Sequence, residues 1–296
     1  MSLGAHADDT PFDPATATLT TPRVINTILA RHGLRADKGF GQHFLTDPRV
    51  VAAVVAAAGV GADDEVWEVG PGLGVLTRAL AATARRVVAI ELDARLLPVL
   101  EETLANAHHV TIRHGDALRA DWSEARPGSR FAANLPYNVG TAVLVRALTS
   151  GRFVGLGVLL QREVAERLVA TAGTPAYGSL SLLIAHHGRA RIVRRVAPGA
   201  FMPPPAVTSA VVAIDLDPDA RPDPTTFAIV RAGFRHRRKT LLSNLRLAGL
   251  EAETVRAVLA DLGLPPAVRA EALDLATFRA LAVRLPAPAR PDGAPT

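Results

Sequence analysis

Four consecutive residues, Asn134-Leu135-Pro136-Tyr137, carry the groups best suited to chemistry on an adenine ring. The exocyclic amine of adenine is a poor nucleophile because its lone pair is delocalised into the ring. An asparagine amide oxygen and a backbone carbonyl can each accept one amine hydrogen, and a tyrosine ring offers a face on which the base can stack. The tetrapeptide therefore predicts a pocket that holds an extruded adenine for alkylation.

Each residue of this signature has an expected role. Asn134 and a carbonyl near Leu135 and Pro136 would accept from the amine, and Pro136 would also fix the loop shape. Tyr137 would stack on one face of the base and Phe201, which precedes three prolines, on the other. Core packing is the alternative role for Tyr137, and anchoring a turn is the alternative for Phe201. No strong general base is required, because methylation acidifies the amine and its proton can leave to water.

A glycine-rich turn lies upstream of the signature, between a predicted strand and a predicted helix. It runs Glu68-Val69-Gly70-Pro71-Gly72-Leu73-Gly74, and its glycines allow a tight turn and close approach to a ligand. Glu91 ends the next predicted strand, where a carboxylate can accept from both ribose hydroxyls of an adenosine. Asp116, after the third strand, can accept from an adenine amine. The arrangement predicts an adenosine-containing cofactor held by Gly70, Gly72, Gly74, Glu91 and Asp116.

Three features favour S-adenosylmethionine over a nicotinamide dinucleotide. The glycines follow the spacing G-x-G-x-G, since Val75 stands where the third dinucleotide-binding glycine would be. Pro71 removes a backbone donor that a pyrophosphate could use. The adenine-grasping signature also follows the fourth predicted strand, on the same edge of the sheet as the turn.

The elements that must position these residues alternate between strand and helix. Strands are predicted at 65–70, 86–93, 109–117, 130–137, 155–161, 190–196 and 209–216, most of them separated by helical segments. This order predicts a parallel, doubly wound Rossmann-like α/β sheet that binds ligands at the carboxyl ends of its strands. A domain over 22–216 would be followed by a small all-helical RNA-binding domain over 217–286, with helical spacing at 226–245. Segments 1–21 and 287–296 are expected to be disordered.

Bulk composition narrows the class of protein. The chain has 296 residues, no cysteine and a formal net charge of +5, which favours a polyanionic partner and permits a reducing cytoplasm. The amino-terminal segment lacks the apolar core of a signal peptide, and no apolar run is long enough to span a membrane. A cytoplasmic protein with no membrane partner is expected.

The chain resembles the KsgA (RsmA) family of small-subunit ribosomal RNA adenine dimethyltransferases over about residues 23–285. Several blocks occur in the family's order: KGFGQHFLTDPRVV, EVGPGLGVLTRAL, NLPYNVGT, LLQREVAERLVA, AYGSLSLL, FMPPPAVTSAVV and FRHRRKTLLSNL. The resemblance implies N6 dimethylation of two adjacent adenosines in a hairpin loop near the 3′ end of 16S ribosomal RNA. It also implies S-adenosylmethionine as cofactor, the 30S subunit or its precursor as partner, a role in small-subunit biogenesis, and a monomer.

The resemblance further implies a set of cofactor contacts. They are His43, Leu45, Gly70, Glu91, Asp116 and Asn134. Many family members carry asparagine at the position of His43, and either side chain can form a hydrogen bond. A buried structural histidine is the alternative role for His43.

Two groups of basic residues are candidate RNA contacts. The first comprises Arg235, Arg237, Arg238 and Lys239, at the start of the helical region, and is the predicted RNA-binding set. The second comprises Arg189, Arg191, Arg194 and Arg195. A solvated face is the alternative for both groups, and Arg238 and Lys239 could instead be pinned against the catalytic domain. The pairs His108-His109 and His186-His187 lack neighbouring ligands, so no metal site is expected.

Three other functions compete with this interpretation. A macrolide-resistance type 23S ribosomal RNA adenine methyltransferase would share the fold, cofactor and adenine signature, but the blocks FMPPPAVTSAVV and RRKTLLSNL and a full helical carboxyl-terminal domain favour the small-subunit family. A non-enzymatic ribosome assembly factor would not need the intact residues 70–74 and 134–137. An oxidoreductase would need a hydride-accepting site, for which the sequence offers no His–Asp or Tyr–Lys pair.

Overall fold

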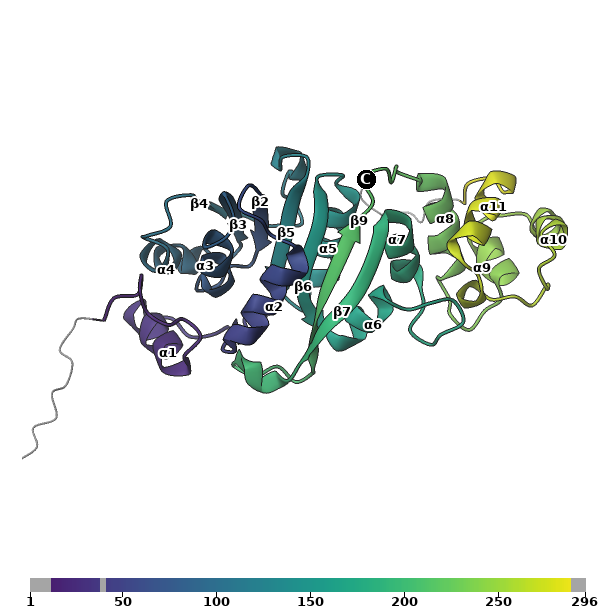
Figure 1. The fold of residues 1–296 in the computed structure, drawn as a ribbon. Coiled ribbons are helices and arrows are strands. Elements are labelled where there is room, and N and C mark those ends of the chain that lie inside the picture. The colour runs from purple at the N-terminus through teal and green to yellow at the C-terminus, as the bar shows by residue number, and fades with distance from the viewer. Residues whose placement is uncertain (1–11, 38–40, 289–296) are drawn as a thin grey trace, which may run out of the picture.

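The computed structural model describes residues 12–37 and 41–288 (Figure 1). A seven-stranded sheet forms its centre, in the order β4-β3-β2-β5-β6-β9-β7. The strands are β2 (Glu65–Val69), β3 (Arg86–Glu91), β4 (Val110–His114), β5 (Ser129–Asn134), β6 (Phe153–Gln161), β7 (Gly188–Val196) and β9 (Ser209–Leu216). All seven coincide with predicted strands, so the α/β prediction is confirmed.

The prediction of a parallel sheet is correct for the pairings among β2 to β6 and wrong for the two pairings of β9. Strands β2 to β6 run parallel, whereas β9 is antiparallel to both β6 and β7. The reason lies in the connection between β7 and β9, which spans only residues 197–208 and has no crossover helix. Parallel neighbours need a long crossover, whereas antiparallel neighbours can be joined by a short segment.

Helices cover both faces of the sheet. Helices α2 (Pro48–Ala58) and α3 (Val75–Ala81) share one apolar cluster with it, and α5 (Gly140–Thr149), α6 (Arg162–Leu168) and α7 (Ser179–His187) contribute to the cluster on the other face. Helix α2 begins and ends as predicted: the Asp47 side chain accepts from the Arg49 amide, and Gly59 ends the helix at φ +64°. A Cβ on Gly157 would lie 2.3 Å from the Val54 carbonyl oxygen, so glycine permits this close helix–sheet packing.

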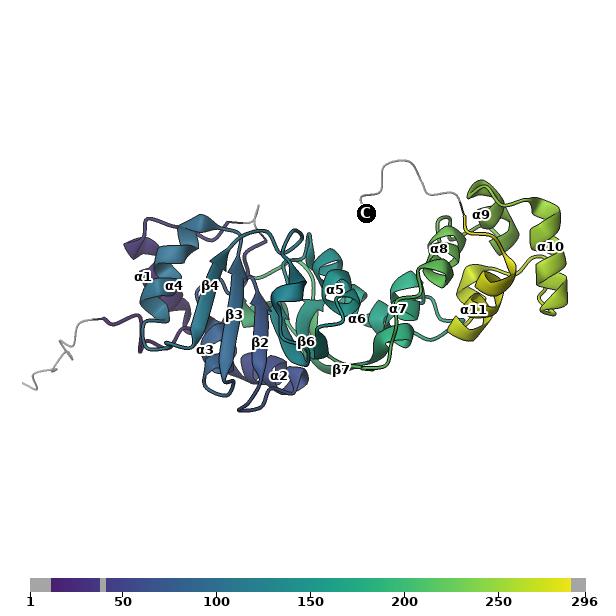
Figure 2. The ribbon, with the colours of Figure 1, turned by 90° about the horizontal axis from the view of Figure 1, so that it is seen from above.

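Helix α1 (Pro22–Arg31) and helix α4 (Leu97–Thr103) lie at the β4 end of the molecule (Figure 2). The structure differs here from the predicted disorder of residues 1–21: residues 12–21 form turns, and residues 1–11 lie outside the described residues. Leu19 is buried in the cluster that α1 forms with Phe44, and the Arg78 guanidinium donates to the carbonyls of Pro14 and Ala17. These contacts hold the segment against the sheet unit.

The helical region lies at the opposite end, beyond α7 (Figure 2). It contains α8 (Pro224–Gly233), α9 (Leu241–Leu247), α10 (Ala252–Asp261) and α11 (Leu275–Arg284), which share one apolar cluster with Tyr177 and Leu182. Helix α7 joins this cluster to the sheet unit, because its neighbouring residues Leu182 and Leu183 belong to different clusters. Most of the carboxyl-terminal segment predicted to be disordered, from residue 289 on, lies outside the described residues.

The helical spacing predicted over 226–245 is interrupted in the structure. Residues 234–240 form a loop between α8 and α9. The Asn244 side chain stabilises this loop, since its Nδ2 donates to the carbonyls of Gly233 and His236 and its Oδ1 accepts from the His236 amide. Thr240 then caps α9 by accepting from the Ser243 amide. The basic residues 235–239 therefore lie in a loop.

Candidate functional site

A cavity of about 250 Å³ opens at the carboxyl ends of the parallel strands. Its walls come from the β2–α3 turn, the ends of β3 and β5, and the segment before α2. Ten of the twelve residues predicted to bind cofactor or adenine line this cavity: His43, Leu45, Gly70, Gly72, Glu91, Asp116, Asn134, Leu135, Pro136 and Tyr137. Gly74 and Phe201 do not line it.

The glycine-rich turn adopts backbone angles that favour glycine. Gly70, Gly72 and Gly74 have φ values of +71°, +59° and +84°. A Cβ on Gly72 would lie 3.2 Å from the ring of Phe44, so the turn and the segment before α2 meet closely at the cavity wall. Gly74 precedes α3, and a Cβ there would press on Leu104. It shapes the turn without facing the cavity.

The Glu91 carboxylate is fixed at the end of β3 by the backbone. Its Oε1 accepts from the Asp93 amide at 2.8 Å and its Oε2 accepts from the Gly72 amide at 3.2 Å. Burial raises the pKa of the carboxyl, and these two amide hydrogen bonds oppose the rise. The carboxylate therefore bridges strand β3 and the glycine turn, in a position to accept from the hydroxyls of a ribose.

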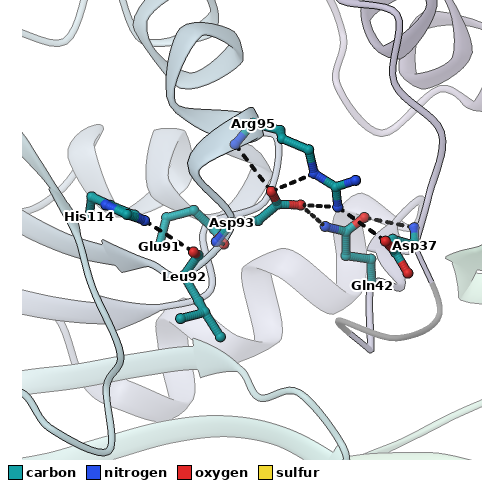
Figure 3. Close-up of polar contacts among 7 residues, drawn as sticks. All are labelled: Asp37, Gln42, Glu91, Leu92, Asp93, Arg95 and His114. Carbon is teal, nitrogen blue, oxygen red and sulfur yellow. Dashed lines mark hydrogen bonds and ion pairs between the residues drawn. The ribbon is translucent and has the colours of Figure 1, made fainter.

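A polar network beside Glu91 was not predicted from the sequence (Figure 3). The buried Asp93 accepts from the Arg95 guanidinium at 2.8 Å and from Gln42 Nε2 at 2.9 Å. Gln42 Oε1 in turn accepts from the Asp37 amide, and the Asp37 carboxylate pairs with Arg95 at 3.1 Å. Hydrogen bonds from Arg95 lower the pKa of Asp93. The network attaches the segment that carries His43 to the end of β3.

A second buried carboxylate lines the cavity without a predicted role. Glu68, one residue before the end of β2, is 1% exposed, and its Oε2 has no hydrogen-bond partner among residues 12–37 and 41–288. Burial raises the pKa of Glu68 to about 8, against a smaller lowering by the neighbouring Thr77 hydroxyl, while the charge of Glu91 adds to the rise. The hydroxyl of Thr77 also lacks a partner of good geometry. The Glu68 carboxyl is therefore largely protonated at neutral pH.

The Asn134 amide is oriented by the segment before α2. Its Nδ2 donates to the His43 carbonyl at 3.0 Å, and its Oδ1 accepts no hydrogen bond from the residues that the structure describes, so this oxygen can accept from a ligand in the cavity. Leu135 is buried, and its amide donates to the Leu159 carbonyl of β6. The Pro136 carbonyl accepts from the Gly140 amide at 2.7 Å. The Leu135 carbonyl accepts no hydrogen bond from the described residues, which makes it the available main-chain acceptor of the signature.

The aromatic residues of the site are arranged differently from the prediction. The Tyr137 ring stacks on the His43 ring, with centroids 5.4 Å apart, and its hydroxyl shares a 2.5 Å hydrogen bond with the Ser209 hydroxyl. Phe201 is buried in the core under α2, in β8 (Phe201–Met202), which pairs with β1 (Phe44–Leu45). Its edge contacts the His43 ring, whose Nδ1 donates to the Pro203 carbonyl at 2.8 Å. The structure thus places Phe201 behind His43, outside the cavity.

Two further residues lie on the far side of the cavity. Asp116 follows β4; its Oδ1 accepts from the Leu118 amide at 2.8 Å, and its Oδ2 lies 3.9 Å from Arg119. Leu92 follows Glu91, lines the cavity and is 52% exposed, an unusual position for a large apolar side chain. Leu92 was missed because a single leucine after a strand carries no distinctive sequence signal.

The predicted RNA-binding residues lie far along the chain, in the loop between α8 and α9. Arg235, Arg237, Arg238 and Lys239 are all exposed. Arg237 donates to the Pro175 carbonyl, and no hydrogen bond or ion pair from the described residues reaches the side chains of the other three. The structure therefore leaves this loop open for a partner, and it does not pin Arg238 or Lys239 against the sheet.

Neither a metal centre nor a membrane segment is found in the part of the chain that the structure describes. Over residues 12–37 and 41–288, no three His, Cys, Asp or Glu side chains gather closely enough to hold a metal ion. No helix in the same ranges has the length and apolar character needed to cross a bilayer. His186 has a structural role: its Nε2 donates to the Arg221 carbonyl and its Nδ1 accepts from Arg279 of α11.

Residues 33–276 match the family model described as ribosomal RNA adenine dimethylase. A Deinococcus radiodurans protein called ribosomal RNA small subunit methyltransferase A is 45% identical over 290 residues, covering 96% of this chain and 99% of that protein. A Phenylobacterium zucineum protein of the same name is 43% identical over 272 residues, covering 89% of this chain and 93% of that protein. The match therefore includes both the cavity and the helical region.

Solved structures support the fold. A dimethyladenosine transferase from Plasmodium falciparum aligns with a TM-score of 0.67 at 22% identity, covering 81% of this chain and 96% of that one. The 23S rRNA methyltransferase ErmE aligns with a TM-score of 0.64 at 24% identity, covering 82% and 99%. Both share the Rossmann-like sheet with this chain. Taken with the family match over the cavity and the helical region, these findings establish that the chain belongs to the ribosomal RNA adenine dimethylase family.

Proposed function

We propose that this chain transfers methyl groups from S-adenosylmethionine to N6 of two adjacent adenosines in a hairpin loop near the 3′ end of 16S ribosomal RNA. Each adenosine receives two methyls, so four cofactors are consumed per RNA. The substrate is the RNA within the 30S subunit or its precursor, and the chain acts as a monomer in the cytoplasm during small-subunit biogenesis. The single observation that carries the proposal is the orientation of Asn134, whose amide oxygen accepts from none of the described residues and lies in a cavity that also contains Glu91.

The residues around the cavity suit this cofactor. Glu91, held by two backbone amides, would accept from the ribose hydroxyls, and Asp116 would accept from the adenine amine. Leu92 would pack against the cofactor's adenine ring. The glycine turn and the unpartnered Glu68 lie on the side where the methionine portion would bind. When bound, S-adenosylmethionine supplies an electrophilic methyl on a sulfonium and leaves as a neutral thioether.

The chain's own residues would activate the target amine by position. Asn134 Oδ1 and the Leu135 carbonyl are two neutral acceptors on adjacent residues, and they would accept the two amine hydrogens. Such acceptors favour a more pyramidal nitrogen, with its lone pair directed at the methyl group. Tyr137 would stack on the base, while His43 and Ser209 hold the tyrosine ring. Orientation and proximity then provide most of the rate enhancement, and the proton leaves to water.

The helical region, residues 217–286, would hold the RNA. Arg235, Arg237, Arg238 and Lys239 project from the α8–α9 loop and would contact phosphates.

The test is transfer of radiolabelled methyl groups to 30S subunits that lack these modifications. Naked 16S RNA and 50S subunits serve as parallel substrates. Label in 30S subunits as N6,N6-dimethyladenosine, approaching four methyls per particle, is the expected result. Label only in the 50S sample would replace the proposed substrate with 23S RNA. Binding to 30S subunits without any transfer would indicate an assembly factor.

A further inference from the structure

Strand β7 carries an unusual density of positive charge for a strand at the edge of a sheet. Four of the nine residues in Gly188–Val196 are arginine: Arg189, Arg191, Arg194 and Arg195. The strand pairs only with β9 and forms one outer edge of the seven-stranded sheet (Figure 1). None of these four arginines lines the cavity described above.

The register of β7 brings three of these arginines onto one face. Side chains alternate along a strand, so residues two apart in register share a face. An irregularity at Val193 adds one residue to β7, which places Arg194 on the face of Arg189 and Arg191. Without the extra residue, Arg194 would point to the opposite face. The partners of the three arginines on β9 are Asp215, Ala213 and Val211.

This arginine row, Arg189-Arg191-Arg194, ends beside the catalytic cavity. Val211 and Ala213 belong to the core cluster under α2, so the row lies on the α2 face of the sheet. Arg194 lines a groove together with Arg195, the start of α2 and the loop after β7. That loop leads into β8, which pairs with Leu45 of the cavity wall, and its Ala200 carbonyl accepts from the Thr46 amide at 2.8 Å.

The other end of the row lies next to the connection to the helical region. Arg189 is the second residue of β7, and the His187 carbonyl just before the strand accepts from the Asp217 amide at 2.8 Å. Asp217 begins the segment that leads to α8. The row therefore spans the distance between the two parts of the molecule that the proposed function assigns to RNA.

The three arginines of the row form no ion pairs within the part of the chain that the structure describes. No carboxylate among the described residues forms an ion pair with Arg189, Arg191 or Arg194, although many other arginines are paired. Asp215 lies opposite Arg189 in register, and Asp47 lies close enough to Arg194 to feel its charge. Asp47 is occupied by Arg49, whose side-chain hydrogen bond is the main reason that the pKa of Asp47 is lowered, while the charge of Arg194 contributes less.

Protection of an exposed sheet edge is the simpler explanation for charges on β7. Charged side chains on edge strands discourage pairing with a second chain. That function would be served by arginines on either face. It accounts neither for the extra residue that aligns three of them nor for the end of the row beside the cavity.

We propose that the arginine row binds successive phosphates of the RNA strand that delivers the target adenine. Residues two apart on a strand are separated by about 6.8 Å, which is comparable with the interval between successive phosphates of a nucleic-acid strand. A guanidinium can bind a phosphate through two hydrogen bonds. The inference rests on the proposed function for the identity of the RNA, while the partner chemistry, an RNA phosphate backbone, follows from the row itself.

The test compares two triple variants with equal loss of charge. The row variant is Arg189→Gln with Arg191→Gln and Arg194→Gln. The control is Arg85→Gln with Arg126→Gln and Arg152→Gln, three residues that precede strands β3, β5 and β6 at the opposite edge from the cavity. Binding to 30S subunits lacking the methyl groups, and to naked 16S RNA, is measured between 50 and 300 mM salt without cofactor. Thermal unfolding verifies that each variant is folded.

The row variant is expected to bind RNA at least ten-fold more weakly than wild type, with a log–log salt slope smaller by about 2. Its affinity for S-adenosylmethionine and its kcat at saturating RNA should match those of wild type. The control should stay within two-fold of wild type. An unchanged slope in the row variant, or an equal loss in the control, would overturn the inference.

The same measurements separate this inference from the proposed reaction. If the row variant bound RNA more weakly and wild type transferred no methyl groups, the arginine row would still be an RNA-binding site, and the proposed reaction would be wrong. If wild type transferred methyl groups and the row variant bound RNA as tightly as wild type, only the RNA-binding role of the arginine row would be wrong. If wild type bound neither 30S subunits nor naked 16S RNA, both proposals would be wrong.

Discussion

The cavity and the basic surfaces of this protein are built on different principles. In the cavity, the two central polar side chains are each oriented by the backbone: Asn134 by the His43 carbonyl, and Glu91 by the Gly72 and Asp93 amides. In the α8–α9 loop, four cations are exposed, and among the described residues one side-chain hydrogen bond, from Arg237 to the Pro175 carbonyl, holds them to the rest of the chain. The cavity therefore holds its polar groups in fixed orientations, whereas the loop presents exposed positive charge.

This difference predicts how each region responds to change. A preoriented group in a cavity acts alone, so its loss removes a specific interaction in the reaction. Phosphate contacts by exposed cations contribute in small, roughly equal amounts, so their effects accumulate with the number removed. A small effect of a cavity substitution, or a large effect of a single loop substitution, would contradict the roles assigned to the two regions.

The largest effect is expected from Asn134→Ala. Loss of the amide oxygen removes one of two acceptors for the target amine, and kcat should fall by about 100- to 1000-fold. Thermal unfolding should change little, since the Asn134 side chain forms a single hydrogen bond within the described part of the chain. Asn138→Ala is the matched control, because Asn138 lines the same cavity, is exposed and has no assigned role. Turnover by Asn134→Ala within three-fold of wild type would contradict the assignment.

Much of the cavity could be predicted from the sequence because most of its residues directly follow predicted strands. The glycine turn, Glu91 and the tetrapeptide at 134–137 each follow a strand directly, and the carboxyl ends of parallel strands meet at one edge. Seven strands were found from alternation and apolar runs alone. Position at a strand end was therefore enough to bring eight predicted residues to one cavity, whereas His43 and Leu45 were predicted only from the family resemblance.

Other features depend on contacts between distant segments, which spacing does not encode. Gln42 reaches Asp93 across 51 residues, and His43 binds the Pro203 carbonyl across 160. The same limit explains Phe201: it was predicted to stack on the adenine, but the pairing of β8 with β1 places its ring in the core. The antiparallel orientation of β7 and β9 likewise followed from a short connection, which the strand pattern alone does not reveal.

The second largest effect is expected when the whole basic loop is neutralised. Arg235, Arg237, Arg238 and Lys239 changed together to glutamine should weaken binding to unmethylated 30S subunits by about 10- to 100-fold at physiological salt, and the log–log salt slope should fall by about 3. Each single change should cost only a few-fold. Filter binding over a salt series measures both quantities, and cofactor affinity should stay constant. One single variant as weak as the quadruple variant would contradict the additive behaviour.

The third prediction concerns the buried carboxyl of Glu68. Its pKa is raised from 4.5 to about 8 in the folded chain, so the folded state retains a proton that the unfolded state loses. The stability that this proton provides is full below the unfolded pKa and is lost as pH rises toward 8. Glu68→Gln cannot ionise, so its unfolding free energy should exceed that of wild type increasingly between pH 5 and 8, by about 4 kcal/mol at the upper end.

Glu65, at the other end of β2, is the control for this pH dependence. Burial raises the pKa of Glu65, but hydrogen bonds from Trp67, the Arg126 amide and Ser129 lower it more, so the net shift is downward. Its contribution to stability is present above the unfolded pKa and is lost as pH falls through the folded one. Glu65→Gln should therefore be less stable than wild type at pH 7, with a smaller difference at pH 3. Parallel pH profiles for the two variants would contradict both assignments.

The smallest effect is expected from Tyr137→Phe, which tests whether the tyrosine acts through its ring or its hydroxyl. The hydroxyl bonds to Ser209, so its removal should cost about 1 kcal/mol of stability and reduce kcat less than five-fold. Tyr137→Leu removes the stacking face and should reduce kcat far more. Tyr177→Phe loses a comparable bond, to the Leu273 carbonyl in the helical cluster, and should lower stability without altering kcat. A large kcat loss in Tyr137→Phe alone would give the hydroxyl a role in the reaction, and the cavity would then contain chemistry beyond positioning.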